Sequence, residues 1–152
     1  MILVEARRQR VLLVDDHAVL REGVRALLGR EADLLVVGEA QNRDEALEAV
    51  RALHPDVALL DVSLGRDNGL ALIPELRAHA PSLKVLVLSM HDEAVFAERA
   101  LQQGANGYIM KDQSVVELLA ALRKVLAGRM YVSGAVSERL LLARSEDPGR
   151  RD

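Results

Sequence analysis

Short apolar runs alternate strictly with amphipathic segments along most of this chain, and this alternation constrains the fold more than any other feature. Continuous runs at 11–14, 34–38, 57–60 and 84–88, and a shorter one that ends at Lys111, have the length and apolar content of β-strands. Between them, apolar residues recur at helical spacing, as in Leu72, Ile73 and Leu76. Runs without polar alternation are typical of strands that are covered on both faces. The pattern therefore predicts a parallel sheet between two layers of helices.

Strand–helix units of this kind place the chain in the α/β class. Crossovers between parallel strands are right-handed, and this leaves few topologies. We expect the flavodoxin-like, doubly wound (βα)5 arrangement with strand order 2-1-3-4-5. With 152 residues, 50% hydrophobic but only 2% aromatic, the chain suffices for one domain whose core consists of Leu, Val and Ala. Asn42, and the pair Ser114 and Glu117, are predicted to cap the second and fifth helices.

The composition excludes several classes of protein. The chain has no cysteine, so it has no disulfide framework, and a reducing cytoplasm is its expected location. Its net charge is −3 and it has no dominant basic cluster, which argues against nucleic-acid binding by this chain alone. No apolar run is long enough to span a bilayer. The four histidines form none of the spacings that are typical of zinc sites.

Polar side chains stand where the predicted strands end. Asp15 and Asp16 follow the first strand, Asp61 the third, Ser89 the fourth and Lys111 the fifth. The carboxyl ends of parallel strands form the ligand site of an open α/β sheet, so we expect these side chains to converge. Three carboxylates against one ammonium leave excess negative charge, which either protons or a bound cation must offset. Mg²⁺, which prefers carboxylate oxygens and water, is the cation that suits these residues best.

A carboxylate beside Mg²⁺ and a lysine can accept a phosphoryl group as an aspartyl phosphate. Phosphoryl transfer depends mainly on positioning and charge neutralisation, which Mg²⁺ and Lys111 would supply, while the hydroxyl of Ser89 would donate to a phosphate oxygen. Asp61, at the tip of the central strand, is the predicted nucleophile. Each feature alone also suits a solvated loop or a helix cap, whereas the combination at four strand ends favours a site.

The order of these residues resembles the receiver domain of bacterial two-component response regulators. That family has an acidic pair after the first strand, Asp at the end of the third, Ser or Thr after the fourth and Lys after the fifth. All four features are present between residues 10 and 128. The segment LLDVSLGRDNG places Gly69 eight residues after Asp61, as in the family. The segments SMHDE and GANGYIMKD, with Asp112 where many receivers have Pro, are similar to the NarL/FixJ (LuxR-type) subgroup.

The resemblance implies how the carboxylates would be used. Asp61 would be the phosphoacceptor and would bind Mg²⁺ directly, together with Asp16 and the backbone carbonyl of Ser63. Asp15 would bind the metal through water. The family usually has Pro four residues after the phosphoacceptor, and here that position is Gly65, which loosens the loop by conformational entropy.

The resemblance also implies which residues would contact or respond to the phosphoryl group. Ser89 and Lys111 would hold its oxygens. Ser89 would further act with Tyr108 as a switch, in which the aromatic ring moves inward on activation. Met90 and His91 would form the rim of the site and control the access of water.

The implied function is a signalling switch and not an enzyme. A sensor histidine kinase would phosphorylate Asp61, and the conformational change, accompanied by homodimerisation, would reach a DNA-binding output domain that regulates transcription. We expect a lead-in at 1–9, the receiver at 10–128, and a linker-like helix with a disordered tail at 129–152. DNA would therefore be bound only through a helix-turn-helix domain that this chain lacks, and no contact with a membrane is expected.

Other interpretations differ in what they require of the sequence. A natural stand-alone receiver, acting through protein–protein contacts, is the alternative to an excised domain. Phosphatases of the haloacid dehalogenase type also use Asp at a strand end with Mg²⁺, but they need a second Asp two residues later, where this chain has Ser63. An interaction module with the same fold and no phosphorylation would lack parts of the site, and here every part is present.

Overall fold

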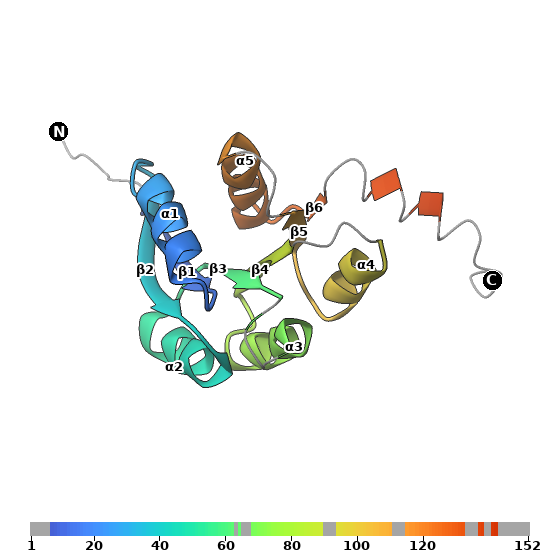
Figure 1. Cartoon of the computed structure of the whole chain (residues 1–152), viewed down its shortest axis with the longest axis horizontal. Helices are drawn as coiled ribbons and strands as arrows, with labels where there is room; N and C mark the ends of the chain where they lie inside the picture. The colour runs from blue at the N-terminus through green and yellow to red at the C-terminus, as the bar shows by residue number, and fades with distance from the viewer. Residues whose placement is uncertain are drawn as a thin grey trace.

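The structure, a computed structural model, describes residues 7–62, 64, 68–89, 94–110, 115–132, 137–138 and 141–142. Its strands and helices alternate in the order β1 Gln9–Val14, α1 Ala18–Leu28, β2 Leu34–Ala40, α2 Arg43–Leu53, β3 Val57–Asp61, α3 Gly69–His79, β4 Lys84–Ser89, α4 Ala94–Gln102, β5 Gly107–Met110, α5 Val115–Leu126 and β6 Tyr131–Val132. The strands form one parallel sheet with the order β2-β1-β3-β4-β5-β6 (Figure 1). The predicted order 2-1-3-4-5 is confirmed, and β6 adds a strand that the sequence did not predict.

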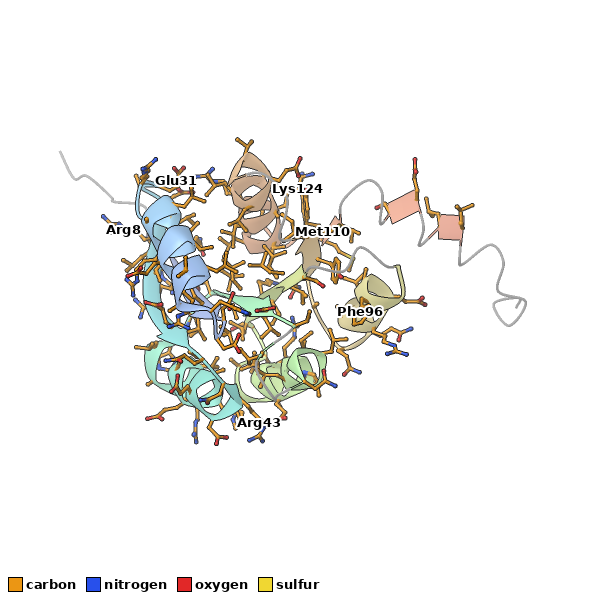
Figure 2. All side chains as sticks on the ribbon, viewed as in Figure 1. Arg8, Glu31, Arg43, Phe96, Met110 and Lys124 are labelled. Atoms are coloured by element: carbon orange, nitrogen blue, oxygen red, sulfur yellow. The ribbon has the colours of Figure 1, made fainter. Side chains whose placement is uncertain are left out.

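Helices cover both faces of this sheet. α1 and α5 lie on one face, and α2, α3 and α4 lie on the other (Figure 1). All five residues of β3 are buried, and they alternate between the two layers: Leu59 packs on the side of α1 and α5, whereas Ala58 and Leu60 pack on the opposite side. Figure 2 shows side chains filling both layers, with charged groups such as Arg43 on the outer surface. The continuous apolar runs of β1, β3 and β4 therefore form doubly covered strands, as predicted, whereas the edge strand β2 is partly exposed.

The ends of α2 follow from local sequence. Asn42 caps this helix, because its side-chain oxygen accepts a hydrogen bond from the backbone N–H of Glu45 at 2.9 Å, as predicted. α2 ends at Leu53, where His54 adopts a left-handed backbone conformation with φ 49° and Pro55 follows. Ser114, the residue predicted to cap α5, lies outside the described residues. No helix in the described part of the chain has the length and apolar content needed to cross a membrane.

The last two helices differ in how much apolar surface anchors them. α5 buries Leu118, Leu122 and Val125 against the sheet. Among the described side chains of α4, Ala97 and Ala100 are the buried ones. Because each buried methylene stabilises a protein by about 0.8 kcal/mol, the two alanines anchor α4 less strongly than the three larger side chains anchor α5.

β6 joins the sheet beside β5. Gly107 pairs with Tyr131, and Tyr108 pairs with Val132. The Tyr131 hydroxyl donates a hydrogen bond to the carboxylate of Glu117 on α5. Burial and this hydrogen bond raise the pKa of Tyr131 to about 12. The residues that follow α5 are therefore attached both to the edge of the sheet and to the helix before them.

Candidate functional site

The register of the parallel strands positions the predicted site residues. Val14 pairs with Leu60, so Asp15 and Asp61 occupy the next positions on the neighbouring strands β1 and β3. Asp61 in turn pairs with the residue that precedes Ser89 on β4. The three polar residues therefore stand at the same edge of the sheet, where the apolar parts of the strands end.

The carboxylates of Asp15, Asp16 and Asp61 form a single cluster, and His17 is a fourth member of it. One potential metal-binding atom from each residue lies within 4.8 Å of the others. Asp61 is fully buried, Asp15 is 5% exposed, and the side chain of Asp16 is 31% exposed. The structure thus brings together the three carboxylates that the strand order placed at one edge, with the deepest of them at the end of the central strand.

His17 had no role in the sequence analysis, and the structure places its ring among the carboxylates. Its Nδ1 atom lies 2.9 Å from Asp15 Oδ1, 3.0 Å from Asp16 Oδ1 and 3.4 Å from Asp61 Oδ2. The backbone N–H of His17 also donates to Asp15 Oδ1 at 2.8 Å. In the sequence, His17 directly follows the acidic pair, and this position is the signal that points to the cluster. Histidine spacings of the zinc type do not include such a position.

The atoms of this cluster suit a divalent cation. Asp16 Oδ1 is buried and accepts no hydrogen bond from the described residues, although His17 Nδ1 lies 3.0 Å away. A ring nitrogen carries at most one hydrogen, so Nδ1 can donate to one of the surrounding oxygens and not to all of them. A buried carboxylate oxygen without a donor costs free energy, which a cation would offset. The oxygen ligands are those that Mg²⁺ prefers.

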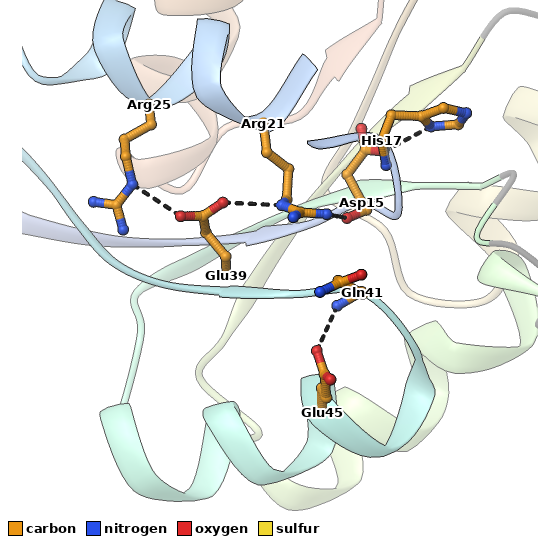
Figure 3. Close-up of polar contacts among 7 residues, drawn as sticks. All are labelled: Asp15, His17, Arg21, Arg25, Glu39, Gln41 and Glu45. Atoms are coloured by element: carbon orange, nitrogen blue, oxygen red, sulfur yellow. Dashed lines mark hydrogen bonds and ion pairs between the residues drawn. The ribbon is translucent and has the colours of Figure 1, made fainter. Parts of the chain in front are cut away.

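Arg21 contacts the loop that carries the acidic pair, and Glu39 links Arg21 to Arg25 (Figure 3). Arg21 on α1 donates to the backbone carbonyl of Asp15 at 2.5 Å and to Glu39 at 2.9 Å, and Arg25 donates to the other carboxylate oxygen of Glu39 at 2.9 Å. Burial opposes ionisation of Glu39, but the hydrogen bonds from Arg25 and Arg21 outweigh burial and lower the pKa of this carboxyl. The ionised Glu39 therefore holds Arg21 in place against the loop.

The remaining predicted site residues divide into two groups. Ser89, at the end of β4, and Tyr108, in β5, are both fully buried. Tyr108 pairs with Val87 on β4, so the two predicted switch residues lie on adjacent strands. The other four predicted residues lie outside the described part of the chain: Ser63, Met90, His91 and Lys111.

Comparison with known proteins assigns this chain to a family. The family model for the response regulator receiver domain matches residues 11–123. The chain belongs to this family. It is 39% identical over 127 residues to the nitrate/nitrite response regulator protein NarL of Escherichia coli K12, and the aligned residues cover 84% of this chain and 59% of NarL. It is 40% identical over 146 residues to the DNA-binding transcriptional activator DevR/DosR of Mycobacterium tuberculosis H37Rv, and this alignment covers 91% of this chain and 66% of that relative.

A solved structure shows the same likeness in three dimensions. A two-component response regulator of the LuxR family from Aurantimonas sp. SI85-9A1 superposes with a TM-score of 0.86 and 33% identity, covering 91% of this chain and 99% of that one. This receiver is therefore of the NarL/FixJ type. Its relatives are response regulators of two-component systems and transcriptional regulators.

Receiver domains are phosphorylation-dependent signalling switches and not enzymes in the ordinary sense. They bind Mg²⁺ at an acidic cluster, and Asp15, Asp16 and Asp61 form such a cluster here. The chain spans 59% of the length of NarL and 66% of the length of DevR/DosR.

Proposed function

We propose that Asp61 accepts a phosphoryl group from a sensor histidine kinase in the presence of Mg²⁺. The observation that carries this proposal is the position of Asp61, buried at the carboxyl end of the central strand and within a few ångströms of two further carboxylates and an imidazole. A carboxylate there can act as a nucleophile, while its neighbours offer oxygen ligands to a cation.

The transfer would form one bond and break one. A carboxylate oxygen of Asp61 bonds to phosphorus, and the bond between phosphorus and the imidazole nitrogen of the kinase phosphohistidine breaks. The leaving imidazole takes up a proton and departs as the neutral ring. Asp16, Asp61 and the backbone carbonyl of Ser63 would hold Mg²⁺, and Asp15 would do so through water. When bound, the cation would neutralise charge on the phosphoryl oxygens, and such neutralisation is a main source of catalysis in phosphoryl transfer.

Residues on the neighbouring strands would then detect the phosphoryl group. Ser89 and Lys111 would hold its oxygens, and Met90 and His91 would limit the access of water at the rim. Movement of Ser89 toward the phosphoryl group would be followed by Tyr108 on the adjacent strand. A phosphoryl group can shift this equilibrium only as far as it interacts differently with the two states.

The output of the switch would involve α4 and further domains. α4 is the element we expect to move, because two buried alanines anchor it weakly to the sheet. The altered surface would favour homodimerisation and would act on a DNA-binding output domain to regulate transcription. The relative named as a DNA-binding transcriptional activator supports this last step. We infer that the protein works in the cytoplasm, where sensor kinases present their phosphohistidine.

The proposal is tested by incubating the protein with Mg²⁺ and acetyl phosphate and then measuring its intact mass. We expect the wild-type protein to gain one phosphoryl group and Asp61→Ala to gain none. Asp44→Ala, which alters an aspartate on α2 whose side chain is 89% exposed, is the matched control and should be phosphorylated normally. Absence of any gain from several phosphodonors, together with absence of Mg²⁺ binding, would refute the proposal.

The two adjacent aspartates should differ in their effect on Mg²⁺ affinity. Asp16→Ala removes a proposed direct ligand, whereas Asp15→Ala removes a group that acts through water. Loss of a group that does not touch the metal typically weakens binding by about 10–100-fold, and this is the loss we expect for Asp15→Ala. Asp16→Ala should weaken Mg²⁺ binding by a larger factor, because it removes a direct ligand. Calorimetric titration with Mg²⁺ measures both, and equal losses would contradict the assignment.

A further inference from the structure

The imidazole of His17 shares the carboxylate cluster but takes no part in the function proposed above. Its Nδ1 atom lies 2.9, 3.0 and 3.4 Å from oxygens of Asp15, Asp16 and Asp61. These contacts reach all three carboxylates from a single ring atom. The Nδ1 atom of His17 therefore lies among the three carboxylates, although much of the side chain is exposed.

The spacing of these atoms matches the spacing of ligands around one metal ion. Mg²⁺ binds oxygen at about 2.0–2.1 Å in octahedral geometry, so neighbouring ligands at right angles are about 3.0 Å apart. The three distances from His17 Nδ1 lie close to this value. A hydrogen bond explains one such contact, because the nitrogen carries at most one hydrogen, whereas a shared cation accounts for all three.

Local structure holds the ring in this position. His17 is the N-cap residue of α1, a position where the side chain of Ser, Thr, Asp or Asn usually accepts a hydrogen bond from a backbone N–H of the first turn, yet the His17 ring makes no such bond. Instead, Asp15 Oδ1 accepts the backbone N–H of His17, and Arg21 holds the carbonyl of Asp15. The loop thus presents the imidazole to the carboxylates and not to the helix.

We propose that His17 is a nitrogen ligand of the cation site and shifts its preference toward Mn²⁺ and Co²⁺ relative to Mg²⁺. Imidazole is a favourable ligand for transition metals, whereas Mg²⁺ prefers oxygen. An additional nitrogen therefore strengthens the binding of Co²⁺ most, strengthens that of Mn²⁺ to a smaller extent, and contributes little to that of Mg²⁺. The inference rests on the proposed function only in placing the cation among Asp15, Asp16 and Asp61.

The test compares the affinities of the wild-type protein and His17→Ala for each metal alone, by calorimetry at one fixed pH and without a phosphodonor. The His17 side chain is 57% exposed, so its removal leaves the core intact. We expect His17→Ala to weaken Co²⁺ binding by about tenfold or more, to weaken Mn²⁺ binding by a smaller factor, and to leave Mg²⁺ affinity within about twofold. His79→Ala, which removes an exposed histidine on α3, is the matched control and should change none of the affinities.

Pulsed electron paramagnetic resonance of the Mn²⁺ complex gives a direct readout. We expect a nitrogen coupling in the wild-type and His79→Ala proteins and none in His17→Ala. Loss of the coupling together with weaker Mn²⁺ binding supports the inference. No nitrogen coupling in the wild-type protein, or equal Mn²⁺ affinity in His17→Ala, overturns it. Tighter binding of all three metals by His17→Ala also overturns it, because the ring would then be a competitor for the site.

These outcomes are separable from failure of the proposed function. If Asp61 is phosphorylated with Mg²⁺ while the Mn²⁺ complex shows no nitrogen coupling, only the role of His17 fails. If the protein binds no divalent cation, the role of His17 fails as well, and the mass measurement on Asp61 decides separately whether the protein is a phosphoacceptor.

Discussion

Gly69, the first residue of α3, should not tolerate a side chain. A Cβ atom at this position would lie 2.6 Å from Val62 Cα, 2.8 Å from Val62 O and 2.9 Å from Asp61 O. Favourable contacts between carbon atoms are at about 3.5–4.0 Å. All three neighbours are backbone atoms of the segment that carries the proposed phosphoacceptor, and no side-chain rotation relieves the overlap. The Gly69 N–H also donates to Val62 O at 3.3 Å, so the two segments cannot separate without losing this bond.

We therefore expect Gly69→Ala to lower the free energy of unfolding by about 1–3 kcal/mol, the usual cost of overpacking a tight site. Gly23→Ala is the matched control. Gly23 lies inside α1, and its added Cβ would have no atom within 4 Å. Alanine is favoured over glycine in a helix interior, so this variant should gain about 0.5–1 kcal/mol. The same substitution should thus change stability in opposite directions at the two glycines.

Urea unfolding followed by circular dichroism measures both variants, and equal slopes against denaturant show that the comparison is sound. For a chain of this length, 1 kcal/mol corresponds to roughly 2–4 °C in Tm. Gly69→Ala should also slow phosphorylation by acetyl phosphate, because relief of the overlap displaces the backbone of Asp61, whereas Gly23→Ala should not. A Gly69→Ala protein as stable as the wild type would refute the reasoning.

Two further predictions concern polar groups away from the acidic cluster. Asn106 Oδ1 accepts hydrogen bonds from the backbone N–H of Val85 at 2.9 Å and from Arg77 at 2.8 Å. Asn106→Ala should cost about 1–3 kcal/mol in urea unfolding, because the Val85 N–H loses this acceptor and Arg77 keeps only its bonds to backbone carbonyls. An unchanged midpoint would contradict this. Burial and the hydrogen bond to Glu117 raise the pKa of Tyr131 to about 12. The neutral hydroxyl therefore contributes fully to stability below the ordinary tyrosine pKa of about 10, and this contribution is lost as pH rises through about 12. Between about pH 10 and 12, the free energy of unfolding should therefore fall less steeply in Tyr131→Phe than in the wild-type protein. Urea unfolding across this pH range measures the difference, and the same pH profile in both proteins would contradict the assignment.

The convergence of the acidic residues was predictable because it depends on topology. Strict alternation of strands and helices implies a parallel sheet, and parallel strands place their carboxyl ends at one edge. Asp15, Asp16 and Asp61 each follow or end an apolar run, so their meeting required no knowledge of side-chain positions. The cap at Asn42 was predictable for a different reason, since an N-cap bond involves residues only a few positions apart.

The course of α3 shows where local rules fail. Pro74 lies inside this helix, where proline removes a backbone hydrogen bond at a cost of about 3 kcal/mol or more. The helix nevertheless continues from Gly69 to His79, and Leu72, Ile73 and Leu76 are buried against the sheet. Burial of side chains of this size contributes roughly 1.5–3 kcal/mol each, which offsets the cost of the proline. Amphipathic spacing predicted this buried face correctly because it reflects that burial.

The first five strands, the helices between them, their order and the edge of the sheet at which charge collects all follow from the sequence, because hydrophobic periodicity and strand ends are local properties of the chain. Three other features arise only when the elements pack together. β6 has two residues, too few for a period, and it joins the sheet through its pairing with Gly107 and Tyr108 on β5. Gly69 is required because α3 begins against the backbone after Asp61. His17 joins the carboxylates because the turn after β1 directs its ring toward β3, and such a direction arises only once the strands lie side by side.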